Sequence, residues 1–162
     1  MIFVRAVLGK NTRSVMVPKN IKYTRFYSGC FLYNSKSNEV LLHKRDGNTK
    51  NNPHKWAFFG GGNEGGETPG DCCVRELMEE LHVEIDSSDL VPVCDYLNIE
   101  KNTWRYIYYI ESELKKSEIN LGEGADFDWI SLDKVFEYDL TEKVREDLKT
   151  FLQLKNKVTK KA

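Results

Sequence analysis

Three glutamates lie close together in the sequence, a short distance after a run of glycines. Glu76, Glu79 and Glu80 are three and four residues apart, so in a helix their carboxylates would share one face. Like charges at these spacings destabilise a helix by roughly 0.2–0.5 kcal/mol per pair. Arg75 is the one cation near them in sequence, and it can pair with Glu79 across one turn. A bound divalent cation would relieve the remaining repulsion, because Mg²⁺ and Mn²⁺ take such oxygen ligands.

The glycine run before these glutamates suits the close approach of a phosphate chain. Gly60, Gly61 and Gly62 leave the backbone free of side chains and its carbonyls exposed. Carboxylates, a metal and an open glycine loop together favour metal-assisted attack of water on phosphorus. An acidic stripe alone would more simply be a solvated helix face. The fixed spacing between this acidic stripe and the glycine run favours a metal and phosphate site instead.

This stretch resembles the Nudix box, written GX5EX7REUXEEXGU with U a bulky aliphatic residue. The positions that match the box are Gly61, Glu67, Arg75, Glu76, Leu77, Glu79, Glu80 and Val83. A match at this many fixed positions is specific, unlike a single glycine motif. The chain is therefore identified as a member of the Nudix hydrolase superfamily, of the MutT-like type. The similarity extends beyond the box and covers most of residues 27–134.

The box departs from the family pattern at one position, where His82 stands in place of glycine. Glycine there normally takes the left-handed conformation that closes a helix. Histidine visits positive φ more often than most residues do. We therefore expect His82 to be a helix cap with a small stability cost, and a metal-binding role for it is the alternative.

The resemblance implies a metal site built on Mg²⁺ or Mn²⁺. Glu76 and Glu80 would be the main metal ligands, beside the backbone carbonyl of Gly60 or Gly61. Glu79 would be a further ligand or the general base. All five positions belong to the box or directly precede it.

Three other residues receive catalytic or structural roles from the resemblance. Glu123 would be the second candidate for the general base, since family members differ in this choice. Arg75 would act in catalysis by orienting the glutamates through Glu67 or Glu79, which makes those two partly structural.

Two residues are candidates for binding the substrate. Arg45 ends a predicted strand opposite the box, where a guanidinium could bind two phosphate oxygens at once. The alternative is a solvated arginine at a strand end. Phe58 could stack on a base, although aromatic residues at alternating strand positions are more often part of the core. His43 and His54 are interpreted as surface residues.

The implied activity is a pyrophosphohydrolase that cleaves a nucleoside diphosphate linked to another group X. The expected substrate is a small nucleotide, either a nucleoside triphosphate or a nucleotide sugar. ADP-ribose-type relatives carry a proline well after the box, and no proline follows Pro92 here. Two alternatives stay open: hydrolysis at carbon, as in GDP-mannose-type relatives, and a nucleotide-sensing module without catalysis.

Strands and helices alternate along the chain. The runs that predict strands are Ile2–Leu8, Ser14–Val17, Phe26–Tyr33, Val40–His43, Leu90–Leu97 and Trp104–Ile110. The first two, separated by Gly9, Lys10 and Asn11, predict a β-hairpin. Thr68 is the expected cap of a helix that begins with Pro69 and places Asp71 in its first turn.

The C-terminal third predicts two further helices. Ser131 is expected to start a short helix and Thr141 a longer one, whose apolar side carries Val144, Leu148, Phe151 and Leu152. The expected fold is a Nudix-type α/β/α sandwich with a mixed β-sheet. Residues 1–162 would form a single domain, with an N-terminal extension at 1–22 and a frayed basic tail at 155–162.

Composition limits the partners and the compartment. The chain has 24 basic and 25 acidic residues and a formal charge of −1, which argues against binding a nucleic acid polymer. Four cysteines without metal-ligand spacing suggest reduced thiols and a cytoplasmic protein, and no apolar run is long enough for a membrane span. The N-terminal hairpin could support a homodimer or only extend the sheet.

Overall fold

The computed structural model describes the backbone of residues 2–8, 11–17, 25–122 and 124–159, and the side chains of 25–122 and 124–157. The strands are β1 (Ile2–Leu8), β2 (Asn11–Val17), β3 (Phe26–Asn34), β4 (Glu39–Lys44), β5 (Trp56–Ala57), β6 (Phe59–Gly62), β7 (Val91–Asn98), β8 (Thr103–Glu111) and β9 (Asp126–Ser131). The α-helices are α1 (Pro69–Leu81) and α2 (Glu142–Thr159). Within these described residues there are four single turns of 3₁₀ helix, η1 (Ser87–Asp89), η2 (Ile99–Lys101), η3 (Lys116–Glu118) and η4 (Val135–Glu137).

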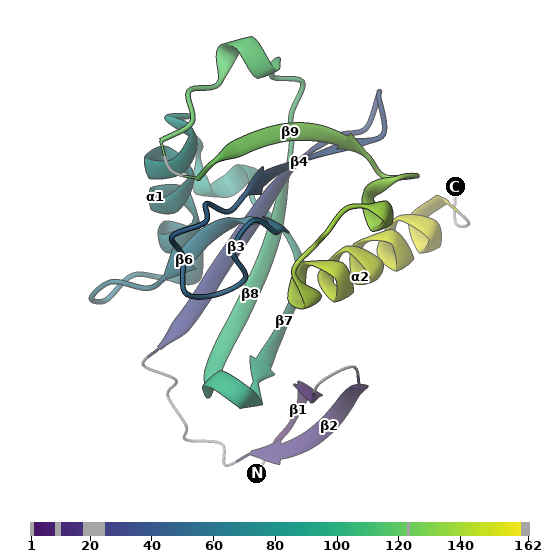
Figure 1. Ribbon diagram of the computed structural model, residues 1–162. Helices are drawn as coiled ribbons and strands as arrows, with labels where there is room; N and C mark the ends of the chain where they lie inside the picture. Colours follow the sequence, from purple (N-terminus) through teal and green to yellow (C-terminus); the bar gives the residue numbers. More distant parts are fainter. Residues whose placement is uncertain (1, 9–10, 18–24, 123, 160–162) are drawn as a thin grey trace.

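One mixed sheet lies between the two α-helices (Figure 1). Its order is β2-β1-β7-β8-β3-β4-β5, with β6 paired to β3 and β9 paired to β4. Strand β3 runs parallel to β8 and antiparallel to β4 and β6. The fold is thus the predicted α/β/α sandwich.

Successive residues of β3 point to opposite layers because strand side chains alternate between the two faces. Cys30 and Leu32 belong to the core beneath α1, together with Leu77. Phe31 and Tyr33 belong to the core beneath α2. A single strand therefore contributes to both apolar layers.

The sheet forks at β3, and the fork opens a space in one face. The C-terminal end of β3 pairs with β4 through Leu32 and Leu41. Its N-terminal half pairs instead with β6, where Gly29 lies opposite Gly60. The end of β4 and the start of β6 therefore diverge from the same strand.

Helix α1 begins and ends where its sequence predicts. Thr68 and Asp71 form a reciprocal capping box, with Asp71 N–H donating to Thr68 Oγ1 at 3.2 Å and Thr68 N–H to Asp71 Oδ2 at 3.3 Å. Pro69 is the first helical residue. At the other end His82 adopts the left-handed conformation, with φ 52° and ψ 37°, and its N–H donates to the Met78 carbonyl. The expectation of a cap at His82 is confirmed.

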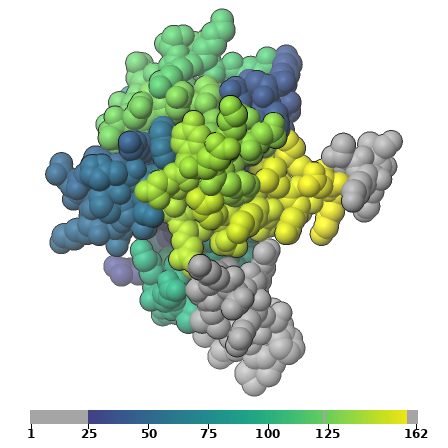
Figure 2. Space-filling model, turned by 45° about the vertical axis from the view of Figure 1, so that its right-hand side comes forward, coloured from purple at the N-terminus to yellow at the C-terminus, as the bar shows by residue number. Residues whose placement is uncertain are grey.

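Helix α2 begins after Thr141, as predicted, and packs Val144, Leu148 and Phe151 into the core. In Figure 2 this helix, in yellow, lies against the green segment that leads into it. The helix continues to Thr159, so residues 155–159 are helical and the expected tail at 155–162 does not begin there. Lys155 Nζ contacts the Tyr33 hydroxyl and donates to Asn38 Oδ1 at 3.0 Å, which fixes this last part of the helix to the sheet.

The short helix expected at Ser131 lies further along the chain. Ser131 is the last residue of β9, and its carbonyl accepts from Lys134 N–H in a turn. The single helical turn η4 follows. Pairing of β9 with β4, which includes Ser131 opposite Glu39, outweighs the local helix signal.

The N-terminal strands β1 and β2 pair antiparallel, and β1 joins the sheet parallel to β7. No helix within the described part of the chain is both long and apolar enough to span a membrane.

Candidate active site

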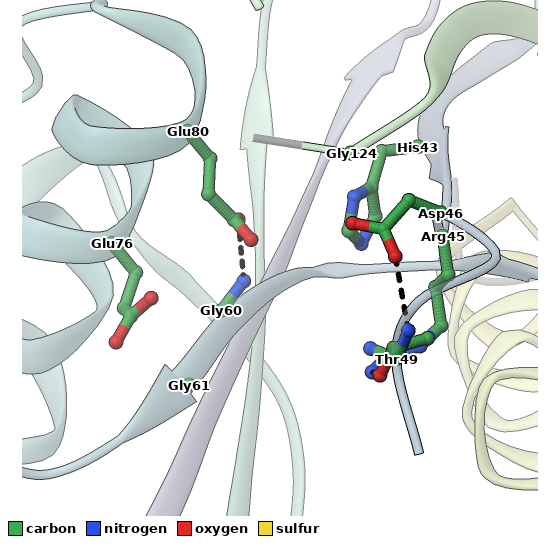
Figure 3. A pocket seen from close by; sticks show the side chains of 9 residues that line it. All are labelled: His43, Arg45, Asp46, Thr49, Gly60, Gly61, Glu76, Glu80 and Gly124. Atoms are coloured by element: carbon green, nitrogen blue, oxygen red, sulfur yellow. Dashed lines mark hydrogen bonds between the residues drawn. The ribbon is translucent and has the colours of Figure 1, made fainter. Parts of the chain in front are cut away.

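A pocket of about 320 Å³ lies at the fork of the sheet. Its walls come from His43, Arg45, Asp46, Thr49, Gly60, Gly61, Glu76, Glu80 and Gly124. In Figure 3 the glutamates enter from α1 on one side, while His43, Arg45 and Asp46 come from the end of β4 and the following loop on the other. The glycines of β6 lie between them.

Glu80 is anchored to the glycine strand. Its side chain is 6% exposed, and its Oε2 accepts a hydrogen bond from the Gly60 N–H at 2.8 Å. Gly60 has φ +135°, and a Cβ there would overlap the Ser28 carbonyl, so no other residue type fits. The backbone of Gly60 thereby positions the carboxylate at the pocket.

Glu76 lies directly over Gly61. A Cβ at Gly61 would overlap the Glu76 carboxyl group, so the missing side chain makes room for the carboxylate. Glu76 and Glu80 are one helical turn apart on α1, and both line the pocket. The predicted pair of acidic residues is therefore brought together with the glycine backbone.

Arg75 connects the acidic residues of the box. Its guanidinium donates through Nε to Glu67 Oε1 at 2.6 Å and through Nη1 to Glu76 Oε1 at 2.9 Å. A longer contact of 3.3 Å reaches Glu79 Oε2, and Nη2 donates to the Gly62 carbonyl at 3.1 Å. Hydrogen bonds from Arg75 hold the pKa of Glu67 below its usual value. Arg75 thus contacts both Glu67 and Glu79, the two residues through which the sequence predicted it to act.

Glu79 differs from its two neighbours in position. Its side chain is 53% exposed, and it is absent from the residues that line the pocket. The side chain of Glu79 is connected to the pocket residues through its contact with Arg75. A role for Glu79 as metal ligand or base therefore requires its side chain to turn away from this ion pair.

The second base candidate, Glu123, lies outside the described residues. Its neighbours are described. Gly122 N–H donates to the Glu80 carbonyl at 2.7 Å, and Gly124 lines the pocket with a φ of +99°.

Arg45 lies at the edge of the pocket and is held by the loop that follows it. Nε donates to the Asn51 carbonyl at 3.0 Å and Nη2 to Thr49 Oγ1 at 2.8 Å. Arg45 lines the wall of the pocket across from Glu76 and Glu80.

Phe58 does not reach the pocket, which corrects the expectation that it binds substrate. It is 1% exposed and stacks on Phe31 with ring centroids 4.8 Å apart. Because β5 and β6 alternate like other strands, Phe58 enters the core beneath α2 and Phe59 the core beneath α1.

His43 is a pocket residue that sequence reasoning assigned to the surface. It is 6% exposed, and its ring lies 5.0 Å from that of Phe59. Nδ1 has no hydrogen-bond partner among the described residues. Burial, and then the charge of Arg45, lowers the pKa of His43 to about 4, so the ring is neutral at neutral pH. His43 directly follows the apolar residues Val40 to Leu42 in the sequence, and this was the signal that it could be buried. His54 is exposed, as expected.

The oxygen atoms at the pocket suit a hard divalent cation. Two carboxylates, of Glu76 and Glu80, and the backbone of Gly60 and Gly61 gather there. Within the described ranges no group of three or more histidine, cysteine, aspartate or glutamate side chains converges to hold a metal. Mg²⁺ keeps several waters and needs few protein ligands, so this oxygen set fits it when water and substrate oxygens complete the shell.

Comparison with known proteins adds an independent result. The family profile of the NUDIX domain matches residues 24–154. DR0079 from Deinococcus radiodurans is 19% identical and has a TM-score of 0.61, with 91% of this chain and 98% of that chain covered. The MutT protein from Methanosarcina mazei Go1 is 21% identical with a TM-score of 0.63, covering 80% and 94%.

A third solved structure is the bifunctional NMN adenylyltransferase/ADP ribose pyrophosphatase from Francisella tularensis, complexed with AMP and a manganese ion. It is 20% identical with a TM-score of 0.63, and the match covers 83% of this chain and 42% of that one. At these identities the three structures show a shared fold.

Proposed function

The chain belongs to the NUDIX domain family and is a Nudix hydrolase, and we propose that it is a divalent-metal-dependent pyrophosphohydrolase acting on a nucleoside diphosphate linked to a group X. The observation that carries this proposal is the convergence of Glu76 and Glu80 on the Gly60–Gly61 backbone, with Arg45 on the opposite wall. An anionic substrate and a cation can be bound together in such a pocket.

Glu76 and Glu80 would hold Mg²⁺ or Mn²⁺ beside the Gly60 or Gly61 carbonyl. When bound, the ion would lower the pKa of a coordinated water and offset phosphate charge. Arg75 positions Glu76 through Nη1. The bonds from Arg75 to Glu67 hold the guanidinium itself in that place. Arg45 would bind phosphate oxygens, a role that its fixed guanidinium plane suits.

In the reaction a water oxygen forms a bond to phosphorus while a bridging phosphorus–oxygen bond breaks. The leaving phosphate takes the electron pair, and a carboxylate takes the proton. Glu79 and Glu123 remain the two candidates for that base. Glu79 has to leave Arg75 to act, whereas Glu123 is the sequence neighbour of Gly124, which lines the pocket.

A second cavity would hold the nucleoside or the group X. A second pocket of about 520 Å³ shares Arg45 and Gly60 with the first. Its walls include Tyr27 and Arg105, and Arg105 is held by a 3.1 Å ion pair with the buried Asp147. The polar character of this cavity supports a small nucleotide, with a nucleoside triphosphate or nucleotide sugar as the proposed class.

A substrate panel tests the proposal. Nucleoside triphosphates, nucleotide sugars, ADP-ribose and dinucleoside polyphosphates are incubated with Mg²⁺ or Mn²⁺, and phosphate and pyrophosphate release is measured. Glu80→Gln keeps an oxygen that can accept from Gly60 N–H but loses the charge, so we expect turnover to disappear in a folded protein. Glu84→Gln, an exposed neighbour, is the matched control. Full activity of Glu80→Gln would refute the proposal.

The same panel addresses the two alternatives. Hydrolysis in ¹⁸O-labelled water places the label in phosphate for attack on phosphorus, and in the sugar for GDP-mannose-type hydrolysis. Silence across the whole panel would favour a nucleotide-sensing module.

A further inference from the structure

The side chain of His82 has a contact that a glycine at this position would lack. α1 ends at Leu81, and His82 takes the left-handed conformation that glycine adopts with least strain. The Nudix motif has glycine here. A histidine here carries a small strain, which a side-chain contact can offset.

That contact is with the described residues 120–122 and 124–125, which we call the bridging loop. His82 Nδ1 lies 3.0 Å from the Asn120 carbonyl. A carbonyl can only accept, so Nδ1 carries the proton and donates. The ring also lies against Gly122, where a Cβ would come within 3.0 Å of His82 Cε1 and would overlap the Glu79 carbonyl.

The bridging loop also closes the end of α1 by its backbone. The last carbonyls of a helix lack partners within the helix. Gly122 N–H donates to one of them, the Glu80 carbonyl, at 2.7 Å. The His82 side chain and the Glu80 carbonyl thus hold two points of the loop, two residues apart.

The far end of the loop is attached to the opposite wall of the pocket. Ala125 N–H donates to the Lys44 carbonyl at the end of β4, at 2.9 Å. Between the two attachments Gly124 lines the pocket opposite Glu80. The loop therefore spans from the helix that carries the acidic residues to the strand that leads to Arg45.

We propose that His82 is a positioning residue, which fastens the bridging loop to α1 and so fixes the pocket wall at Gly124 relative to Glu80. The inference rests on the proposed function, because the base candidate Glu123 lies in the sequence between Gly122 and Gly124 of this loop. It assigns a use to the position at which the chain departs from the family motif.

Two substitutions separate this role from simple capping. His82→Gly supplies the best residue for the left-handed conformation but removes the contact to Asn120. His82→Asn places an amide N–H where Nδ1 was and also tolerates that conformation. We expect His82→Gly to melt at or above the wild-type temperature yet to lose about tenfold in kcat, as displaced catalytic groups do. His82→Asn is expected to keep kcat within about threefold of the wild type.

A second readout does not need activity. Hydrogen exchange of the Gly122 amide, which donates to Glu80, is measured in the wild type and both variants of the full chain. Faster exchange in His82→Gly, with wild-type exchange in His82→Asn, supports the proposal.

The outcomes are distinguishable from failure of the proposed function. A wild type that cleaves nothing in the panel refutes the hydrolase, and amide exchange alone then decides the role of His82. Unchanged Gly122 exchange in His82→Gly overturns the inference. An unchanged kcat in an active His82→Gly enzyme overturns it as well.

Discussion

Arg75 and Glu67 form a two-point ion pair, with Nε 2.6 Å from Oε1 and Nη2 3.2 Å from Oε2. This geometry fixes the plane of the guanidinium. Its remaining nitrogen, Nη1, then points at Glu76 Oε1 from 2.9 Å. The Arg75–Glu67 pair thereby positions a carboxylate that lines the pocket.

We expect Arg75→Lys to reduce kcat about 10- to 100-fold, because a lysine is a point charge and cannot bridge Glu67 and Glu76 together. Steady-state kinetics with the best substrate of the panel measures the effect. Arg25→Lys, at an exposed position, is the control and should match the wild type. Full activity of Arg75→Lys would show that Glu76 does not need this support.

Gly61→Ala is predicted to abolish turnover while Gly66→Ala leaves it unchanged. A Cβ at Gly61 overlaps the Glu76 carboxyl group, whereas a Cβ at Gly66 meets nothing within 4 Å. The alanine forces Glu76 out of the pocket. Kinetics and titration with Mn²⁺ should both report the loss, and an active Gly61→Ala enzyme would contradict the placement of Glu76.

Phe58→Leu tests whether Phe58 belongs to the core. Loss of the stacked contact with Phe31 should lower the free energy of unfolding by about 1–2 kcal/mol, as for other changes of shape in a core. KM should stay within twofold of the wild type, since the side chain is buried away from the pocket. Urea unfolding and kinetics measure the two quantities. A raised KM without loss of stability would restore Phe58 as a substrate contact.

His43 should make the protein less stable as the pH falls from about 6.5 to 4. The pKa of His43 is lowered from 6.5 to about 4, first by burial and then by Arg45. In this window the unfolded chain binds a proton that the folded chain does not. The stabilisation is fully present above pH 6.5, and about 2 kcal/mol of it is lost between pH 7 and pH 5.

Urea unfolding at pH 7 and pH 5 measures this loss. His43→Gln lacks the titrating ring, so the difference between the two pH values should shrink by about 2 kcal/mol in the variant. His54→Gln, at an exposed position, should leave the difference as in the wild type. An equal loss in the wild type and His43→Gln would place the pH dependence elsewhere.

Local patterns predicted the α1 region well. The Nudix spacing, the cap at Thr68 and the departure at His82 are all read within one stretch of sequence, and the capping contacts that form there are local too. Glu76 and Glu80, two of the acidic residues named from the sequence, both line the pocket because their spacing puts them one turn apart on the same helix.

Positions that depend on distant segments were less predictable. Phe58 and Phe59 are neighbours in sequence, yet they enter opposite cores, and the alternation alone does not say which layer faces the site. His43 is buried by Phe59 and Gly124, which come from other parts of the chain. The lysine-rich composition of the last residues suggested a tail. The end of α2 is instead held by contacts of Lys155 with Tyr33 and Asn38, which lie 122 and 117 residues away in the sequence.

Glu80 holds two different segments through two different groups. Its carboxylate accepts from Gly60 and its carbonyl accepts from Gly122. From Gly60 the connections run through β3 to β4, and from Gly122 through the bridging loop back to β4. Hydrogen bonds at Glu80 therefore tie α1 to two sides of the pocket, to β6 at Gly60 and to the bridging loop at Gly122. One residue thus joins α1 to both walls, through its side chain on one side and its main chain on the other, so a shift of α1 at Glu80 would move both walls of the pocket together.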